Sequence, residues 1–138
     1  VNNPLCIHWA PAEQNFWNGA LERRLLRKDL RSENWEWFDL LQVFKQEPIV
    51  MEGCLNFSLK NIARSMKKHG FIKTIWDKNS SCLDGKSAMI GAWKAHKDAK
   101  SRGISLRDTP EMKEIAKYNE VDVKVLQEII TYLRENHL

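Results

Sequence analysis

A tyrosine and an aspartate lie four residues apart in a C-terminal stretch that has the periodicity of a helix. At about 100° per residue, the stretch Met112 to Leu133 places Tyr118 and Asp122 on one narrow stripe. The other members of the stripe are apolar: Ile115, Leu126, Ile129 and Leu133. Burying an unpaired carboxylate is unfavourable, so Asp122 needs a cation, hydrogen-bond donors or a metal ion as its partner.

The spacing of this pair allows two interpretations. A carboxylate can hold a hard divalent cation, and a phenol one helical turn away can orient a water molecule on that cation. A structural acid that is hydrogen-bonded within the fold is the alternative, and it is the more frequent one. The sequence leaves both interpretations of Tyr118 and Asp122 open.

Two further acids fall in apolar surroundings. Glu13 follows the predicted strand Leu5 to Trp9, and it shares a helical face with Phe16, Trp17 and Ala20. A glutamate in a first helical turn is also favoured by the helix dipole in any protein. Asp39 lies between Phe38 and Leu40, where it either caps a helix that begins at Leu40 or faces inward.

Helix-capping residues predict the elements that position these acids. Ser58 predicts a helix to about His69, ended by Gly70, and Asp84 predicts a helix from Gly85 to about Lys100. The predicted inner face of the second helix is Met89, Ala92, Trp93 and His96. Thr109 and Pro110 predict the start of the last helix, and Phe71 to Trp76 is either a short strand or an extended link. We therefore expect an α/β fold, rich in helix, with a small sheet.

Four short motifs together resemble a nuclease family. Tyr118-x-x-x-Asp122-Val123 resembles the third motif of the DEDDy subgroup of DnaQ-like 3′–5′ exonucleases, within the ribonuclease H-like superfamily. His8 to Glu13 has the spacing of the second motif, with glutamate in place of the usual aspartate. The predicted RecB-associated ribonuclease H-like nucleases are closer, because their pattern also contains segments similar to Phe38-Asp39-Leu40 and Ser58-Leu59-Lys60. The four motifs occur in the right order over residues 8 to 123.

The resemblance implies metal-dependent removal of nucleotides from the 3′ end of single-stranded DNA or RNA. It implies two Mg²⁺ or Mn²⁺ ions held by Asp122, Glu13 and Asp39, with Tyr118 orienting the attacking water. The family's first motif, Asp-x-Glu, occurs nowhere in this sequence. We therefore expect residues 1–138 to be one partial ribonuclease H-like domain with an incomplete sheet and little activity of its own. The alternative is a non-catalytic helical module that binds nucleic acid or a protein.

Basic residues cluster on two predicted helices. We expect one cluster, together with His8, to contact nucleic acid: Lys60, Arg64, Lys67 and Lys68. A second cluster comprises Lys94, Lys97, Lys100 and Arg102. Either cluster could follow a phosphate backbone, or it could simply be a solvated helix face, given a net charge of only +4. The six tryptophans could stack on bases, although core packing explains most of them more simply.

Composition limits the class of protein. The chain has 138 residues, 43% of them hydrophobic, and no apolar run that approaches the roughly 18 residues of a membrane span. Three widely spaced cysteines without a CxxC pair indicate a reducing compartment, and we expect a cytoplasmic protein. A sheet that lacks strands has an unpaired edge, so we also expect a tendency to form homo-oligomers.

Overall fold

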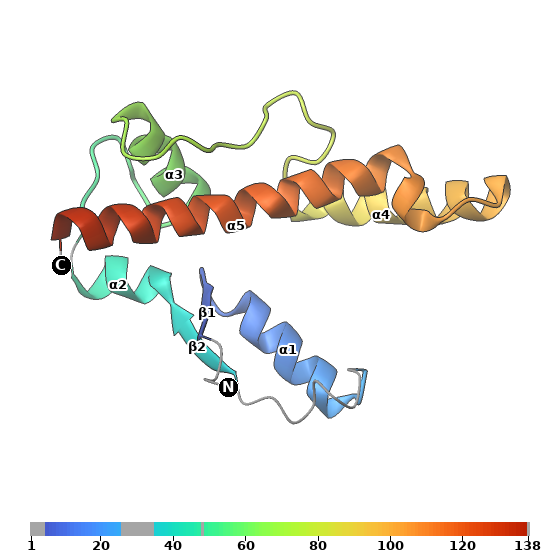
Figure 1. The fold of residues 1–138 in the computed structure, drawn as a ribbon, viewed down its shortest axis with the longest axis horizontal. Coiled ribbons are helices and arrows are strands. Elements are labelled where there is room, and N and C mark those ends of the chain that lie inside the picture. The colour runs from blue at the N-terminus through green and yellow to red at the C-terminus, as the bar shows by residue number, and fades with distance from the viewer. Residues whose placement is uncertain (1–4, 26–34, 48, 138) are drawn as a thin grey trace. The chain divides into compact units, whose positions relative to one another are not determined.

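The structure is a computed structural model that describes residues 5–25, 35–47 and 49–137. Its described part is mixed α/β and rich in helix, with one two-stranded parallel sheet (Figure 1). The chain divides into two compact units, residues 1–66 and residues 67–138. This confirms the predicted helix-rich α/β class with a small sheet, while the ribonuclease H-like fold stays a prediction.

The first unit is built around the parallel strand pair. Strand β1 (Leu5–His8) pairs with β2 (Glu36–Asp39), so that Leu5 lies opposite Glu36 and His8 opposite Asp39. Parallel neighbours need a crossover connection, and helix α1 (Ala12–Glu22) lies in it. Helix α2 (Leu40–Gln46) then follows β2 directly. Each strand has a single strand partner within the described ranges, which leaves edges of the kind expected to favour self-association.

Trp9 is central to the core of this unit. Its ring packs against Phe44 with the centroids 5.2 Å apart, and its indole N–H donates to the Phe57 carbonyl at 3.0 Å. The other buried apolar residues are Leu40, Ile62, Ala63 and Met66. By contrast, α1 has no buried residue, and 84% of Phe16 is exposed. On the predicted apolar face of this helix, Phe16 is therefore exposed, whereas Trp17 and Ala20 are half-buried.

Helix α3 (Leu59–Lys68) has the predicted boundaries. The Ser58 hydroxyl accepts from the Asn61 N–H at 3.3 Å, and Gly70 after the helix has a φ of 77°. Glycine reaches this left-handed conformation without the steric penalty that a Cβ introduces, and so it ends the helix.

The second unit consists mainly of two long helices that lie side by side (Figure 1). Helix α4 (Gly85–Arg102) and helix α5 (Pro110–His137) are joined by Gly103 and the short 3₁₀ turn η1 (Leu106–Asp108). The residues before α4, from Phe71 to Trp76, form an extended link that is neither helix nor strand.

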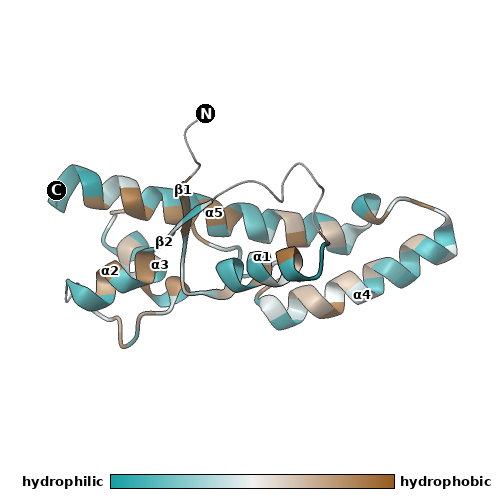
Figure 2. Cartoon of the chain, turned by 90° about the horizontal axis from the view of Figure 1, so that it is seen from below, coloured by the Kyte–Doolittle hydropathy of each residue, from teal (hydrophilic) through white to brown (hydrophobic). Residues whose placement is uncertain are grey.

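Helix α4 is turned differently from the prediction. Ala95 and Ala99 are its buried residues, whereas 76% of Met89 and 62% of Trp93 is exposed, and His96 is also exposed. Alanine lets two helices approach closely, so the small residues of α4 occupy the contact and the large ones point outward. Figure 2 shows apolar residues concentrated in the N-terminal half of α4 and hydrophilic residues in its C-terminal half. The prediction of Met89, Trp93 and His96 as the inner face was wrong.

Candidate functional site

Asp122 has a hydrogen-bond donor within its own unit. The Trp76 indole N–H donates to Oδ1 of Asp122 at 2.8 Å. Trp76 is buried, with 9% of its surface exposed, and Asp122 is half-buried on α5. A donor on the extended link therefore meets part of the requirement for a partner that the sequence left open, which agrees with the structural-acid interpretation.

Tyr118 and Asp122 lie at the edge of the buried face of α5. Both side chains are half-buried, whereas Val125 and Ile129 are fully buried. Val125 was not part of the predicted stripe, so the buried face is rotated from the one that the periodicity placed inward. The rotation leaves Asp122 partly accessible to solvent, one turn beyond Tyr118.

Asp39 caps helix α2, which confirms one of its two predicted positions. Its Oδ1 accepts from the Leu41 N–H at 3.0 Å and from the Ala10 N–H at 2.9 Å. Its Oδ2 accepts from the Gln42 side-chain amide at 3.3 Å. The carboxylate thus fixes the start of α2 and holds the turn after β1, and both of its oxygens are already hydrogen-bonded.

The two remaining predicted site residues near β1, His8 and Glu13, differ in exposure. His8 is buried, with 4% exposed, and lies edge-on to Trp37 with the ring centroids 5.6 Å apart. Its Nδ1 is within hydrogen-bond distance of the Ala10 carbonyl oxygen, in a turn where Ala10 has a φ of 66°. Glu13 is exposed on α1. A buried His8 offers no surface for the nucleic-acid contact expected of it, and Glu13 is not on a buried face.

The predicted metal ligands are divided between the two units. Glu13 and Asp39 belong to the first unit, and Tyr118 and Asp122 belong to the second. In the ranges 5–25, 35–47 and 49–137, no three His, Cys, Asp or Glu residues group in a way that could hold a metal ion. Neither unit by itself brings together the ligand set that the family resemblance implies.

The structure also reveals two hydrogen-bonded glutamates on α5 that spacing did not single out. Glu128 accepts from the hydroxyl and backbone N–H of Thr74 and from the Lys73 N–H. Glu114 accepts from Ser80 at 2.8 Å and from Lys117 at 2.9 Å. Both bind the segment before α4 to α5. Glu128 is not a member of the predicted apolar stripe, and no local signal links it to a threonine 54 residues away.

The predicted basic cluster on α3 forms one face of that helix. Arg64, Lys67 and Lys68 are exposed and Lys60 is half-buried. This α3 basic face lies opposite the buried residues Ile62 and Met66, because the cluster repeats at helical spacing.

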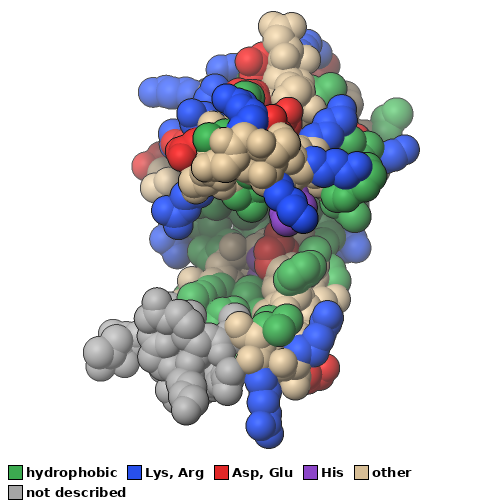
Figure 3. Space-filling model, turned by 90° about the vertical axis from the view of Figure 1, so that its right-hand side faces the viewer, with side chains coloured by type: hydrophobic (Ala, Val, Ile, Leu, Met, Phe, Trp, Pro, Cys, Tyr) green, Lys and Arg blue, Asp and Glu red, His purple; other side chains and the backbone are tan. Residues whose placement is uncertain are grey.

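A second basic face lies on α4 and includes an exposed tryptophan. Helical spacing places the following exposed residues on what we call the α4 outer face: Lys86, Met89, Ile90, Trp93, Lys97 and Lys100. The Lys97 Nζ lies 3.7 Å from the centroid of the Trp93 ring. Figure 3 shows Lys and Arg side chains projecting around the part of the molecule formed by α4 and α5, with hydrophobic side chains exposed among them. The sequence predicted a basic cluster on this helix but missed the exposed tryptophan within it, because Trp93 was placed inward.

Aromatic rings stack close to the C-terminal end of α3. Phe71 stacks on Tyr132 with the ring centroids 4.6 Å apart and the planes 20° apart. His69 stacks on Phe71 at 5.7 Å and 22°. Phe71 remains 40% exposed, and Lys67, Lys68 and Lys73 are its basic neighbours in sequence.

Comparison with protein-family models, curated proteins and solved structures finds no match to this chain. The resemblance to DnaQ-like exonucleases therefore rests on the four sequence motifs alone. No helix within the described ranges is long and apolar enough to span a membrane.

Proposed function

We propose that this chain is a single-stranded nucleic-acid-binding module related to the DnaQ-like exonucleases, and that it does not hydrolyse phosphodiester bonds by itself. The observation that carries the proposal is the exposure of Trp93 among lysines on the α4 outer face. An indole offers a flat surface for a base, and stacking of this kind contributes about 1–3 kcal/mol per base without sequence preference. Lysines on either side attract the phosphates.

The α3 basic face and the adjacent aromatic stack support the same function. Lys67 and Lys68 are exposed at the end of the helix, and Phe71, three residues after Lys68, is 40% exposed and stacked on Tyr132. Cationic side chains next to accessible aromatic rings are the usual composition of a surface that binds single strands. Duplex DNA conceals its bases, so it can use only the electrostatic part of such a surface.

The acids argue against hydrolysis by this chain. Asp39 uses both carboxylate oxygens to cap α2 and hold the Ala10 turn, and Asp122 accepts from Trp76. The family's Asp-x-Glu motif is also missing from the sequence. Two-metal hydrolysis requires several carboxylates around a pair of ions about 4 Å apart.

Fluorescence anisotropy with a 5′-labelled oligothymidylate would test the binding proposal. We expect the double variant Lys86→Gln/Lys97→Gln to lower the affinity and to reduce the salt dependence by about 1.4 in the log–log slope, because two phosphate contacts disappear. The matched control is Lys45→Gln/Lys113→Gln, which removes the same charge from exposed positions outside both basic faces. If both double variants lose the same affinity, binding depends only on the net charge of the protein, which contradicts the proposed surface.

A metal-dependent 3′–5′ exonuclease is the second candidate function. Its specific support is the half-buried Tyr118 and Asp122, one turn apart on α5. Incubation with a 5′-labelled single strand and Mn²⁺, with products separated on a denaturing gel, distinguishes the two candidates. Trimming from the 3′ end that Asp122→Asn abolishes would establish the exonuclease and overturn the non-hydrolytic proposal. Calorimetric titration with Mn²⁺ that gives no heat of binding would contradict the exonuclease.

A further inference from the structure

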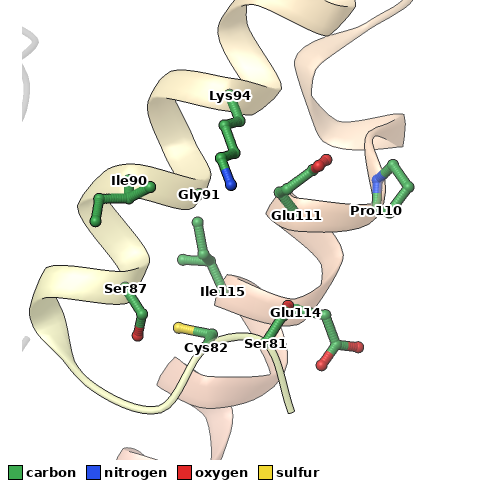
Figure 4. A pocket seen from close by; sticks show the side chains of 10 residues that line it. All are labelled: Ser81, Cys82, Ser87, Ile90, Gly91, Lys94, Pro110, Glu111, Glu114 and Ile115. Carbon is green, nitrogen blue, oxygen red and sulfur yellow. The ribbon is translucent and has the colours of Figure 1, made fainter.

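A pocket of about 290 Å³ lies between the N-terminal half of α4 and the first turns of α5. Its apolar wall is formed by Ile90, Gly91 and Ile115, and Cys82 closes one side (Figure 4). Lys94 and Ile115 point toward each other across the space between the helices. The exposed residues Ser81, Lys94 and Pro110 also line the pocket, so a small molecule could enter from solvent.

One carboxylate of the pocket has an unmet requirement. Oε2 of Glu111 is buried, and in the described part of the chain it has no hydrogen-bond partner. Leaving such an acceptor unsatisfied is unfavourable, and a donor from a ligand would remove the penalty. Glu111 stands in the first turn of α5, at the positive end of the helix dipole.

The other acid of the pocket, Glu114, already has hydrogen-bond donors and a cationic partner. The Lys117 ammonium and the Ser80 hydroxyl donate to Glu114 at 2.9 and 2.8 Å, and they hold the pKa of that carboxyl below its ordinary value. Glu114 is therefore ionised and paired. The charges left for a ligand are one carboxylate, on Glu111, and one ammonium, on Lys94. No ion pair joins these two residues in the ranges that the structure describes.

We propose that this pocket binds a small zwitterion, namely a free α-amino acid with an aliphatic side chain. The amino acid's ammonium pairs with the carboxylate of Glu111, whose side chain turns toward the ligand on binding, and the amino acid's carboxylate accepts from Nζ of Lys94. Its side chain packs on Ile90, Gly91 and Ile115. A ligand with equal and opposite charges matches a pocket that presents one unpaired charge of each sign, and the volume lies at the small end of ligand-binding sites.

Three probes separate this proposal from simpler ones. They are L-leucine, isopentylammonium (leucine without its carboxylate) and 4-methylpentanoate (leucine without its ammonium). Each is titrated into the ¹⁵N-labelled full chain, and amide shifts are followed by NMR. We expect saturable shifts at Gly91, Lys94 and Ile115 with leucine, and about tenfold weaker binding of each singly charged probe, because each loses one charged contact. Isopentylammonium binding as tightly as leucine would make this a cation site and overturn the proposal, and so would the absence of saturable leucine shifts.

Variants test which side chains recognise the ligand. Glu111→Gln and Lys94→Met are each expected to weaken leucine binding about tenfold. The control Lys113→Met removes an exposed ammonium on α5 outside the pocket, and it should leave the affinity unchanged. Leucine binding that persists unaltered in Glu111→Gln contradicts the assignment.

Gly91→Ala provides a variant that keeps the fold. A Cβ at Gly91 would lie 3.5 Å from Cδ1 of Ile115 and 3.8 Å from Cβ of Glu111, which is ordinary van der Waals contact. The methyl group therefore occupies pocket space without a clash, and we expect weaker leucine binding in a fully folded protein. An unchanged leucine affinity in this variant would show that the amino acid binds elsewhere.

Discussion

The indole N–H of Trp76 donates a 2.8 Å hydrogen bond to Oδ1 of Asp122, from a position 46 residues earlier in the chain. Trp76 lies on the extended link and Asp122 on α5, so this contact ties the link to the long helix. The residue that most resembles a nuclease ligand is thus also a structural acceptor. Variants at the two ends of this hydrogen bond can separate these roles.

Trp76→Phe keeps an apolar ring but removes the donor. The half-buried carboxylate then loses a hydrogen bond, and we expect the free energy of unfolding to fall by about 1–3 kcal/mol. Urea unfolding followed by circular dichroism measures the change. Asp122→Asn, which retains a carbonyl acceptor for the indole, should be less destabilising. Equal stability of Trp76→Phe and the wild type would show that the hydrogen bond contributes nothing to the fold.

Asp39→Ala removes the N-cap of α2 and the acceptor for the Ala10 N–H. We expect the free energy of unfolding to fall by about 1–2 kcal/mol, the range seen for strong N-caps, and Asp39→Asn to recover part of the loss. The same unfolding experiment with and without Mn²⁺ tests the metal-ligand role. Stabilisation of the wild type by Mn²⁺ that Asp39→Ala abolishes would assign this residue to a metal site.

Glu128 gives the fold a pH dependence with a defined sign. Partial burial favours its neutral form, but hydrogen bonds from Thr74 and Lys73 and the charge of Lys67 outweigh burial, so the Glu128 pKa lies below its ordinary value. A carboxyl whose pKa is lower in the folded protein stabilises it above the unfolded pKa, and that stability disappears as pH falls through the folded pKa. Thr74→Val should raise the Glu128 pKa in a ¹³C NMR titration of the carboxyl group. A Glu128 titration that is the same in Thr74→Val and in the wild type would contradict the role of Thr74.

Trp93→Ala tests base stacking on the α4 outer face. We expect the free energy of binding to oligothymidylate to become less favourable by about 1–3 kcal/mol, because one base loses its stacking partner. The salt dependence of binding should change little. Phe16→Ala is the matched control, because it removes an aromatic ring that is 84% exposed on α1. If both variants bind as the wild type does, the strand does not stack on Trp93.

Two glycines of α4 should respond in opposite directions to replacement by alanine. Gly91 lies inside the helix with room for a Cβ, so Gly91→Ala should raise the free energy of unfolding by about 0.5–1 kcal/mol. Gly103 ends the helix with a φ of 62°, where a Cβ is strained, so Gly103→Ala should lower it by about 1 kcal/mol. Thermal unfolding of the two variants measures both effects. A stabilised Gly103→Ala would contradict the left-handed helix end.

Helix boundaries could be predicted from the sequence because capping is a local interaction. Asp84 and Ser87 form a capping box at the start of α4. Asp39 caps α2 by accepting from the N–H of Leu41, two residues later in the chain. Such contacts join residues within about one helical turn, so the order of residues is sufficient to find them. The strand at Leu5 follows from its apolar run for the same reason.

The sequence determined where α3 and α4 begin and end and where α5 begins, and which residue types could carry out chemistry. Only the tertiary structure decided which faces are buried and which partners the acids have. The inner face of α4 is set by alanines that let α5 approach, so Trp93 is exposed although hydropathy alone places it inside. Asp122 accepts a hydrogen bond from a tryptophan 46 residues away, and Oε2 of the half-buried Glu111 has no accessible surface beside a pocket formed by two helices. These relationships depend on how distant segments pack, and that information is not contained in any local pattern of the chain.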